Sequence, residues 1–310
     1  MRYLMPVLLI ITGLQLPAQE LYLDDASFHK SRQPGDGMWV EKVNPADQSN
    51  AQYSRDNITF KKGKQFVYNY YFIEHNGKEK KKFLLSSRDS ISNPLRLAKY
   101  DRPADSLLDK VLLQVTDEKE TYAACMQDSS CTQTTILYTY LMRQPAGSTA
   151  ASLFRSKRSG QLYSQQGARA TGVVDNKKNI WLHPPRQFTF RILQLSPFPF
   201  YLFDTTITNW AWNVEVGGAY LDPRWINSKT NLIVRYAYER VSDEVITTPF
   251  GNLRCKVVIG TGRSVSHPEF SSSMKSYFHP EYGFVLMDYK NVDGSKLVLQ
   301  LEELQTADAF

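Results

Sequence analysis

The sequence lacks long hydrophobic runs, is poor in cysteine and contains no complete catalytic or cofactor motif. No apolar run reaches the roughly 18 to 20 residues that a helix needs to cross a bilayer, so we expect no transmembrane segment in the mature chain. Three cysteines in 310 residues exclude a disulfide-dense miniprotein. With 42% hydrophobic and 22% charged residues, the chain is not intrinsically disordered and can bury a full core.

Catalytic and metal-binding patterns are also absent. The five histidines show no His-x-x-x-His or metalloprotease spacing, and no Gly-x-Ser-x-Gly elbow or glycine-rich phosphate loop occurs. Adjacent carboxylates such as Glu302 and Glu303 point to opposite faces of a strand, so none forms an acid/base dyad by itself. We therefore predict a protein that is not an enzyme and uses no metal or cofactor. A hydrolase site assembled in space stays open as an alternative.

The first 18 residues have the pattern of a secretory signal peptide. Arg2 supplies a basic start, Leu4 to Leu14 is a mostly apolar stretch, and Leu16-Pro17-Ala18 resembles a cleavage site. We expect cleavage after Ala18 and export to the periplasm or the outer-membrane surface. No cysteine stands at the cleavage site, which argues against a lipid anchor, and removal of Arg2 lowers the formal net charge from +6 to +5.

Export places the three cysteines in a compartment where disulfides persist. Cys125 and Cys131 bracket a polar five-residue loop between two strand-like runs, and in a hairpin their sulfurs would face each other. We predict a disulfide between them; a zinc pair is the alternative, but no nearby histidine or cysteine completes four ligands. Cys255 alternates with Val257 and Ile259 on the apolar side of a strand, which predicts a buried, inert thiol.

The dominant period after residue 60 is two, which predicts a mainly β protein. Closely spaced strands joined by tight turns, such as Asn76-Gly77, favour antiparallel pairing. Residues 103–113 fit a helix as well as a strand, and 241–244 are expected to form a turn. The expected fold is an open, strongly curved antiparallel sheet, a half-barrel, with few short helices. The expected organisation is a signal peptide (1–18), an irregular lead-in (19–55), an N-terminal β meander (56–143), a linker or long loop (144–176), a C-terminal antiparallel region (177–304) and a tail (305–310). One continuous sheet is the alternative to two domains.

Seven lysines between residues 60 and 82 form a candidate basic surface. Such a surface could meet an anionic headgroup, a polysaccharide or an acidic partner, or it could discourage edge-to-edge aggregation of the strands. Nucleic acid is disfavoured as a partner because no recognition fold occurs. The lysines are Lys61, Lys62, Lys64, Lys78, Lys80, Lys81 and Lys82.

Residues 183–203 are the most unusual stretch, because they combine prolines with many aromatic side chains. Two prolines among Pro197 to Phe203 exclude a regular central strand. The stretch could line the mouth of a lipid-sized cavity or form a plug that closes the core beneath the sheet. Trp210 and Trp212 fall on one side of a strand and are expected to extend this apolar surface. The candidate ligand-lining residues are Phe188, Phe190, Ile192, Phe198, Phe200, Phe203, Trp210 and Trp212.

The C-terminal half resembles a group of uncharacterised secreted β proteins of Gram-negative envelopes. Trp210-Ala211-Trp212, the hairpin Thr248 to Cys255 and the segment Tyr277 to Val285 carry this resemblance, which covers roughly residues 195–304. These proteins look like TapB-like proteins and, distantly, periplasmic lipoprotein carriers of the LolA type. The resemblance implies a curved sheet with an apolar interior, and the carrier comparison implies acyl-chain binding inside the curve. It supplies no catalytic residues.

Two non-catalytic roles follow. The first is a protein that binds or carries a lipid or other apolar or amphipathic ligand within the curved sheet. The second is a structural or assembly partner of an envelope complex, with the lysine hairpin and the aromatic loop as contact surfaces. A dry cavity of several hundred cubic ångströms would favour the first role. An interior filled with side chains would favour the second.

Overall fold

A computed structural model describes most of the chain from residue 57 onwards. The described residues are 57–84, 96–100, 107–117, 133–145, 153–175, 177, 179–186, 188–216, 221–226 and 230–306, with three short strands nearer the N-terminus, β1 (Leu21–Tyr22), β2 (Phe28–Lys30) and β3 (Trp39–Glu41). The signal peptide and most of the expected lead-in lie outside these residues.

The described part is built almost entirely of strands, as the period of two predicts. The first group is β4 (Lys64–Ile73), β5 (Lys81–Leu84), β6 (Arg96–Lys99), β7 (Leu108–Asp117), β8 (Gln133–Arg143), β9 (Leu153–Arg155) and β10 (Leu162–Asp175). The second group is β11 (Asn179–Leu182), the 3₁₀ helix η4 (Phe188–Leu195), β12 (Phe200–Leu202), β13 (Asn209–Val216), β14 (Leu232–Thr248), β15 (Gly251–Ser264), β16 (Ser271–His279), β17 (Gly283–Lys290) and β18 (Lys296–Thr306).

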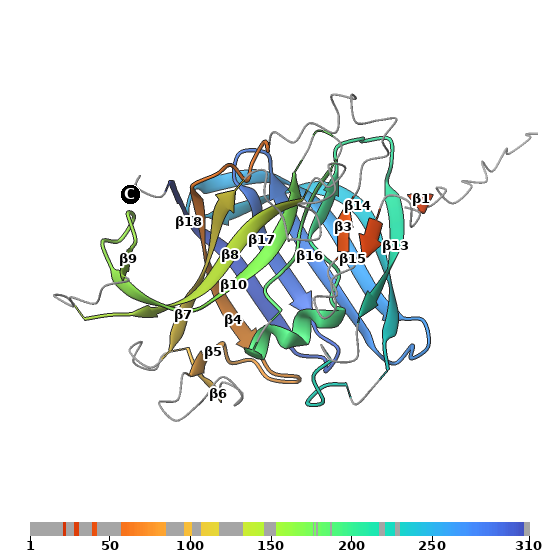
Figure 1. Cartoon of the computed structure of the whole chain (residues 1–310), viewed down its shortest axis with the longest axis horizontal. Helices are drawn as coiled ribbons and strands as arrows, with labels where there is room; N and C mark the ends of the chain where they lie inside the picture. Colours follow the sequence, from red (N-terminus) through yellow and green to blue (C-terminus); the bar gives the residue numbers. More distant parts are fainter. Residues whose placement is uncertain are drawn as a thin grey trace, which may run out of the picture.

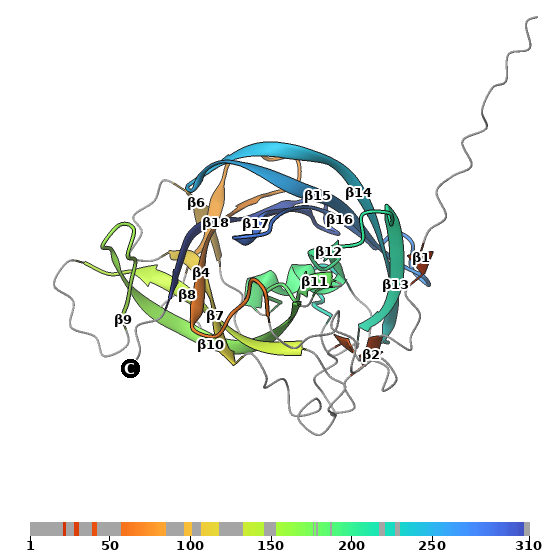
Figure 2. The ribbon, with the colours of Figure 1, turned by 90° about the horizontal axis from the view of Figure 1, so that it is seen from above.

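A single large sheet joins both halves of the chain. Its strands follow the order β1-β13-β14-β15-β16-β17-β18-β4-β7-β8-β10-β11-β12, and β5, β6 and β9 attach beside this path. The pairs along the path are antiparallel except β1 with β13, and β2 and β3 form a separate pair. The sheet rolls around a central space without closing (Figures 1 and 2). The predicted fold class, an open and strongly curved antiparallel sheet, is confirmed.

Three expectations about the local structure are settled by the pairing. Residues 144–176, expected as a linker or long loop, instead contain β10, which pairs with β8 from Tyr163 to Val174 and keeps the sheet continuous. Residues 241–244 form a bulge within β14 rather than a turn, because the strand continues to Thr248. Residues 103–113 fitted a helix as well as a strand; from Leu108 onwards they form the strand β7, and 101–106 lie outside the described residues.

Bulges interrupt the register of several strand pairs. They occur in β14 between Val241 and Glu244, in β18 between Leu301 and Glu303, and in β10 between Gln166 and Arg169. An extra residue on one strand increases the local twist, and this lets long antiparallel strands curl. Most of the alternating apolar side chains therefore converge on one large interior core, and a smaller buried cluster packs apart from it: Val67, Leu112, Leu141, Phe154 and Tyr163. Among the described residues, no helix is long and apolar enough to cross a membrane.

Candidate functional site

The interior of the rolled sheet is filled by a segment of the chain itself. Residues 188–203, which we call the plug, consist of η4, the Pro197–Pro199 stretch and β12. β12 extends the sheet by pairing with β11, and Figure 2 shows both strands and η4 inside the curve. The sequence left two interpretations of this stretch, the mouth of a cavity and a plug that closes the core. In the structure the stretch lies inside the curve as a plug.

Six of the eight candidate ligand-lining residues are buried in this core, each at most 2% exposed. They are Phe190, Ile192, Phe198, Phe200, Trp210 and Trp212. Phe203 is half-buried at the edge of the same cluster, and the side chain of Phe188 lies outside the described part. The rings contact each other: Phe198 and Phe200 lie 5.5 and 5.7 Å from Trp212 and Trp210, between ring centroids. The sequence identified a real cluster, whose members fill the interior by packing together; whether they also bind a ligand stays a prediction.

Two glycines on β15 allow the plug to lie close to the sheet. A Cβ atom on Gly262 would lie 2.6 Å from the carbonyl oxygen of Leu195, and one on Gly260 would lie 3.1 Å from two side-chain carbons of Pro197. Ser272 on the neighbouring strand donates a hydrogen bond to the same Leu195 oxygen over 2.9 Å. Real Cβ atoms essentially never approach other heavy atoms below 3.0 Å. The absence of side chains at Gly260 and Gly262 therefore lets the plug pack directly against β15. In the sequence, this contact is indicated by two glycines that alternate on the inner face of one strand.

Arg186 fixes the plug from its N-terminal side. Its Nη2 donates to the carbonyl oxygen of Ser196 over 3.0 Å, and its guanidinium lies 4.2 Å from the ring centroid of Phe198. The backbone oxygen of Arg186 accepts a hydrogen bond from Gln194 Nε2 over 3.1 Å. Burial raises the pKa of Tyr236, and the nearby Arg186 charge offsets part of that rise. Because the guanidinium both stacks on the Phe198 ring and donates a hydrogen bond to the backbone of the plug, it holds this part of the plug in place.

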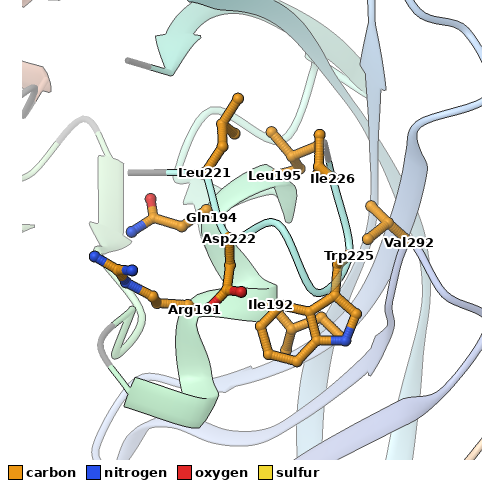
Figure 3. A pocket seen from close by; sticks show the side chains of 9 residues that line it. All are labelled: Arg191, Ile192, Gln194, Leu195, Leu221, Asp222, Trp225, Ile226 and Val292. Atoms are coloured by element: carbon orange, nitrogen blue, oxygen red, sulfur yellow. The ribbon is translucent and has the colours of Figure 1, made fainter. Parts of the chain in front are cut away.

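A small cleft remains between the plug and the 221–226 loop, at one end of the roll. Figure 3 shows its lining, which combines aliphatic side chains with Arg191, Asp222 and Trp225. Its volume is about 10 Å³, room for about one water molecule and far below a ligand site. Arg224 donates to both carboxylate oxygens of Asp222, over 2.9 and 2.6 Å. Burial raises the pKa of Asp222, but the Arg224 hydrogen bonds lower it more, so it lies below its usual range.

The seven lysines of the candidate basic surface lie at two separate ends of β4. Lys61, Lys62 and Lys64 precede or begin this strand, whereas the other four follow its end and lie in the 74–80 loop and β5. A ten-residue strand spans about 33 Å, so the two groups cannot contact one small partner together. At the far end, Lys81 pairs with Glu74, and Lys80 lies 4.2 Å from the ring centroid of Tyr71.

Lys82 is not a surface residue. Its Nζ contacts Asp109 Oδ1 at 2.9 Å and Asn69 Oδ1 at 2.8 Å, and it is 3% exposed. Burial lowers the pKa of Lys82, and the Asp109 carboxylate offsets part of that fall. For Asp109, burial raises the pKa, but the Lys82 charge and hydrogen bond outweigh it and hold the pKa below its usual range. This buried ion pair was missed because sequence spacing does not reveal which lysine of a run folds inward.

The buried carboxylates of the described part are each held by hydrogen bonds. Asp175 Oδ2 accepts the backbone N–H groups of Thr59 and Phe60 over 2.7 and 2.8 Å, and Glu303 accepts from Ser156 Oγ over 2.5 Å. Burial raises the pKa of Asp175, and the backbone donors reduce that rise. These contacts hold both carboxylates in place, whereas the second oxygen of Asp175, Oδ1, is buried without a hydrogen-bond partner.

Of the three cysteines, only Cys255 lies within the described residues. Cys255 is fully buried and unpaired, as predicted, and burial raises the pKa of its thiol to about 11. Cys125 and Cys131 lie in 118–132, outside the described residues, so their disulfide stays a prediction. Within the described ranges, no group of three or more His, Cys, Asp or Glu residues is placed to hold a metal ion.

No protein-family model and no curated protein matches the chain. Three solved structures are similar to it. A candidate exported protein with a YmcC-like fold from Bacteroides fragilis is 11% identical, with a TM-score of 0.35 over 81% of this chain and 99% of that chain. A candidate lipoprotein from Parabacteroides distasonis is 14% identical, with a TM-score of 0.38 over 80% and 97%. A β-barrel-like domain of unknown function from Brucella abortus is 9% identical, with a TM-score of 0.26 over 79% and 98%. At such low TM-scores these likenesses carry no argument, and the resemblance to LolA-type and TapB-like proteins stays a prediction.

Proposed function

We propose that the mature chain is an exported, non-catalytic envelope protein that acts through its outer surface, as a structural or assembly partner of an envelope complex. The observation that carries this proposal is the filled interior: Phe198, Phe200 and Trp210 are fully buried against their neighbours. The cleft beside the plug has a volume of only about 10 Å³. A closed interior leaves the outer surface as the part of the described molecule that is available for recognition.

The exposed aliphatic side chains of the outer surface offer places to detect such a partner. Ile233 and Val265 are 49% and 63% exposed and are joined by a backbone hydrogen bond of 2.8 Å, so they form a small apolar pair near one end of the sheet. Single apolar residues on a surface are ordinary. Their value here is that a photo-crosslinking amino acid at either position should not disturb the core.

The carrier role remains a second candidate, because several buried polar atoms around the plug have no hydrogen-bond partner. They are Arg186 Nε, Ser196 Oγ and Trp210 Nε1. Each unpaired buried group costs about 1 to 3 kcal/mol, which weakens the closed arrangement. A lipid or other amphipathic molecule could occupy the aromatic interior if the plug moved out.

Two measurements separate these roles. We expect photo-crosslinking in intact cells at Ile233 or Val265 to give a discrete adduct with another envelope protein, while Thr205, an exposed turn residue, serves as the matched control position. We expect native mass spectrometry of envelope-purified protein to show the mass of the mature chain alone. A co-purifying lipid together with no site-dependent adduct would replace the assembly role by the carrier role.

A further inference from the structure

One end of the roll gathers basic side chains from two segments that are distant in the sequence. Lys61, Lys62 and Lys64 come from the start of β4, and Lys157 and Arg158 from the β9–β10 turn; we call this set the basic end. All except Lys64 are exposed. Figure 1 shows β9 and the end of β18 at this side of the molecule, with β5 and β6 at the opposite end.

Hydrogen bonds hold these segments together. Lys157 Nζ donates to the carbonyl oxygen of Thr306 over 3.1 Å, and Thr306 is the register partner of Lys64. Arg158 Nη1 donates to the carbonyl oxygens of Pro249 and Glu302 over 3.0 and 3.1 Å. The cations are therefore placed by the fold on one side of the molecule, and their positions do not depend on one flexible hairpin.

Apolar side chains lie at the turns beside these cations. Phe250 in the β14–β15 turn stacks on Tyr282 in the β16–β17 turn, with ring centroids 4.5 Å apart, and both are half-buried. Ile58, which precedes the basic residues of the first segment, is 45% exposed. Thr59 Oγ1 donates to the carbonyl oxygen of Pro280 over 3.3 Å, which links this segment to the β16–β17 turn.

We propose that this end of the roll docks on an anionic phospholipid surface, with the lysines and arginine at the headgroups and the turn residues Phe250, Tyr282 and Ile58 at the interface. Cations near a membrane are attracted by its negative surface potential, and aromatic side chains favour the interfacial region. Cations and apolar side chains that are spread over several turns suit an extended layer of headgroups better than a single acidic peptide. The inference goes beyond the proposed assembly role and shares with it only the requirement for export.

Nearby acidic groups reduce the net positive charge of the basic end. Glu281 is exposed and its charge acts on Lys64, whereas Glu303 is buried and already accepts the backbone N–H of Arg158 over 2.9 Å. Glu118 and Glu120 follow β7 in the sequence and lie outside the described residues. An assay with the full mature chain includes their contribution.

The test is cosedimentation of the purified mature protein with vesicles of phosphatidylglycerol and phosphatidylcholine, compared with vesicles of phosphatidylcholine alone. We expect binding only to the anionic vesicles, decreasing as salt rises, because screening shortens the reach of exposed charges to about 10 Å at 0.1 M. Each lysine near such a surface contributes about fivefold in binding. Lys61→Glu with Lys62→Glu should therefore weaken binding at least about 25-fold.

The opposite end of β4 provides the matched control. Lys78→Glu with Lys80→Glu changes the charge of the whole protein by the same amount and should leave vesicle binding unchanged, with unfolding midpoints confirming that both variants fold. Equal losses in the two variants would show attraction by net charge alone and overturn the inference. No binding of the wild type to anionic vesicles would also overturn it, while site-dependent adducts in cells would leave the assembly role standing.

Discussion

Replacing Gly262 by alanine tests whether the plug is seated in solution as it is in the structure. The added Cβ atom would lie 2.6 Å from the Leu195 carbonyl oxygen and 3.1 Å from both Ser272 Oγ and Tyr236 Cε1. The carbonyl oxygen belongs to the backbone of the plug, so relief requires the plug to move away from β15. Gly262 has no left-handed backbone angle, so the substitution changes contacts without straining its own conformation.

The expected cost combines two effects. Overpacking in a dense core costs about 1 to 3 kcal/mol, and loss of the 2.9 Å hydrogen bond from Ser272 to Leu195 costs about 1 kcal/mol more. Together they lower the free energy of unfolding by about 2 to 4 kcal/mol, a large share of the usual 5 to 15 kcal/mol. Thr261→Ala, on the exposed face of the same strand, should change it by no more than about 1 kcal/mol.

Urea unfolding followed by tryptophan fluorescence measures the stability of both variants. Trp181 and Trp212 report on the plug, because the ring centroid of each lies within 5.6 Å of that of Phe198, and the two indoles are 5.6 Å apart. A lower midpoint for Gly262→Ala with an unchanged slope would agree with a seated plug. An unfolding midpoint equal to that of Thr261→Ala would refute the reasoning. It would mean that the plug does not rest on β15 in solution.

Three further predictions concern buried groups. The lowered pKa of Asp109 means that its pairing stabilises the fold above about pH 4 and that this contribution is lost as the pH falls through the folded pKa; Asp109→Asn should cost about 3 to 5 kcal/mol in urea unfolding at neutral pH and should lose this acid dependence. The raised pKa of Asp175 has the opposite sign, so its contribution is present at low pH and is lost as the pH rises through the folded pKa. Asp175→Asn should therefore be at least as stable as the wild type at pH 7, whereas Asp175→Ala should lose about 1 to 3 kcal/mol because backbone donors are left unpaired; equal losses in both variants would contradict this. Thiol titration of the exported protein should detect no reactive group in the native state and only Cys255 in denaturant, whereas three thiols in denaturant would exclude the disulfide between Cys125 and Cys131.

The amino-acid sequence by itself determined the class of the fold and much of its local structure. Alternation of apolar and polar residues assigns faces wherever a strand is buried on one side, and Trp210 and Trp212 indeed lie together in the core. Turn chemistry is equally local: Asn76 adopts a positive φ of 60° in the predicted hairpin. The burial of Cys255 follows from the same alternation.

The tertiary structure decided how these local elements are connected and closed. Pairing of β18 with β4 joins the N-terminal and C-terminal groups of strands into one sheet, and no local pattern specifies partners more than 200 residues apart. Whether residues 188–203 form an open mouth or a plug depended on the room beside β15. Gly260 and Gly262 leave this room, because a Cβ atom on Gly262 would crowd Leu195 and one on Gly260 would crowd Pro197. The lysines were divided between two ends because the ten residues of β4 separate them, and Lys82 turned inward because Asp109, on another strand, compensates its charge.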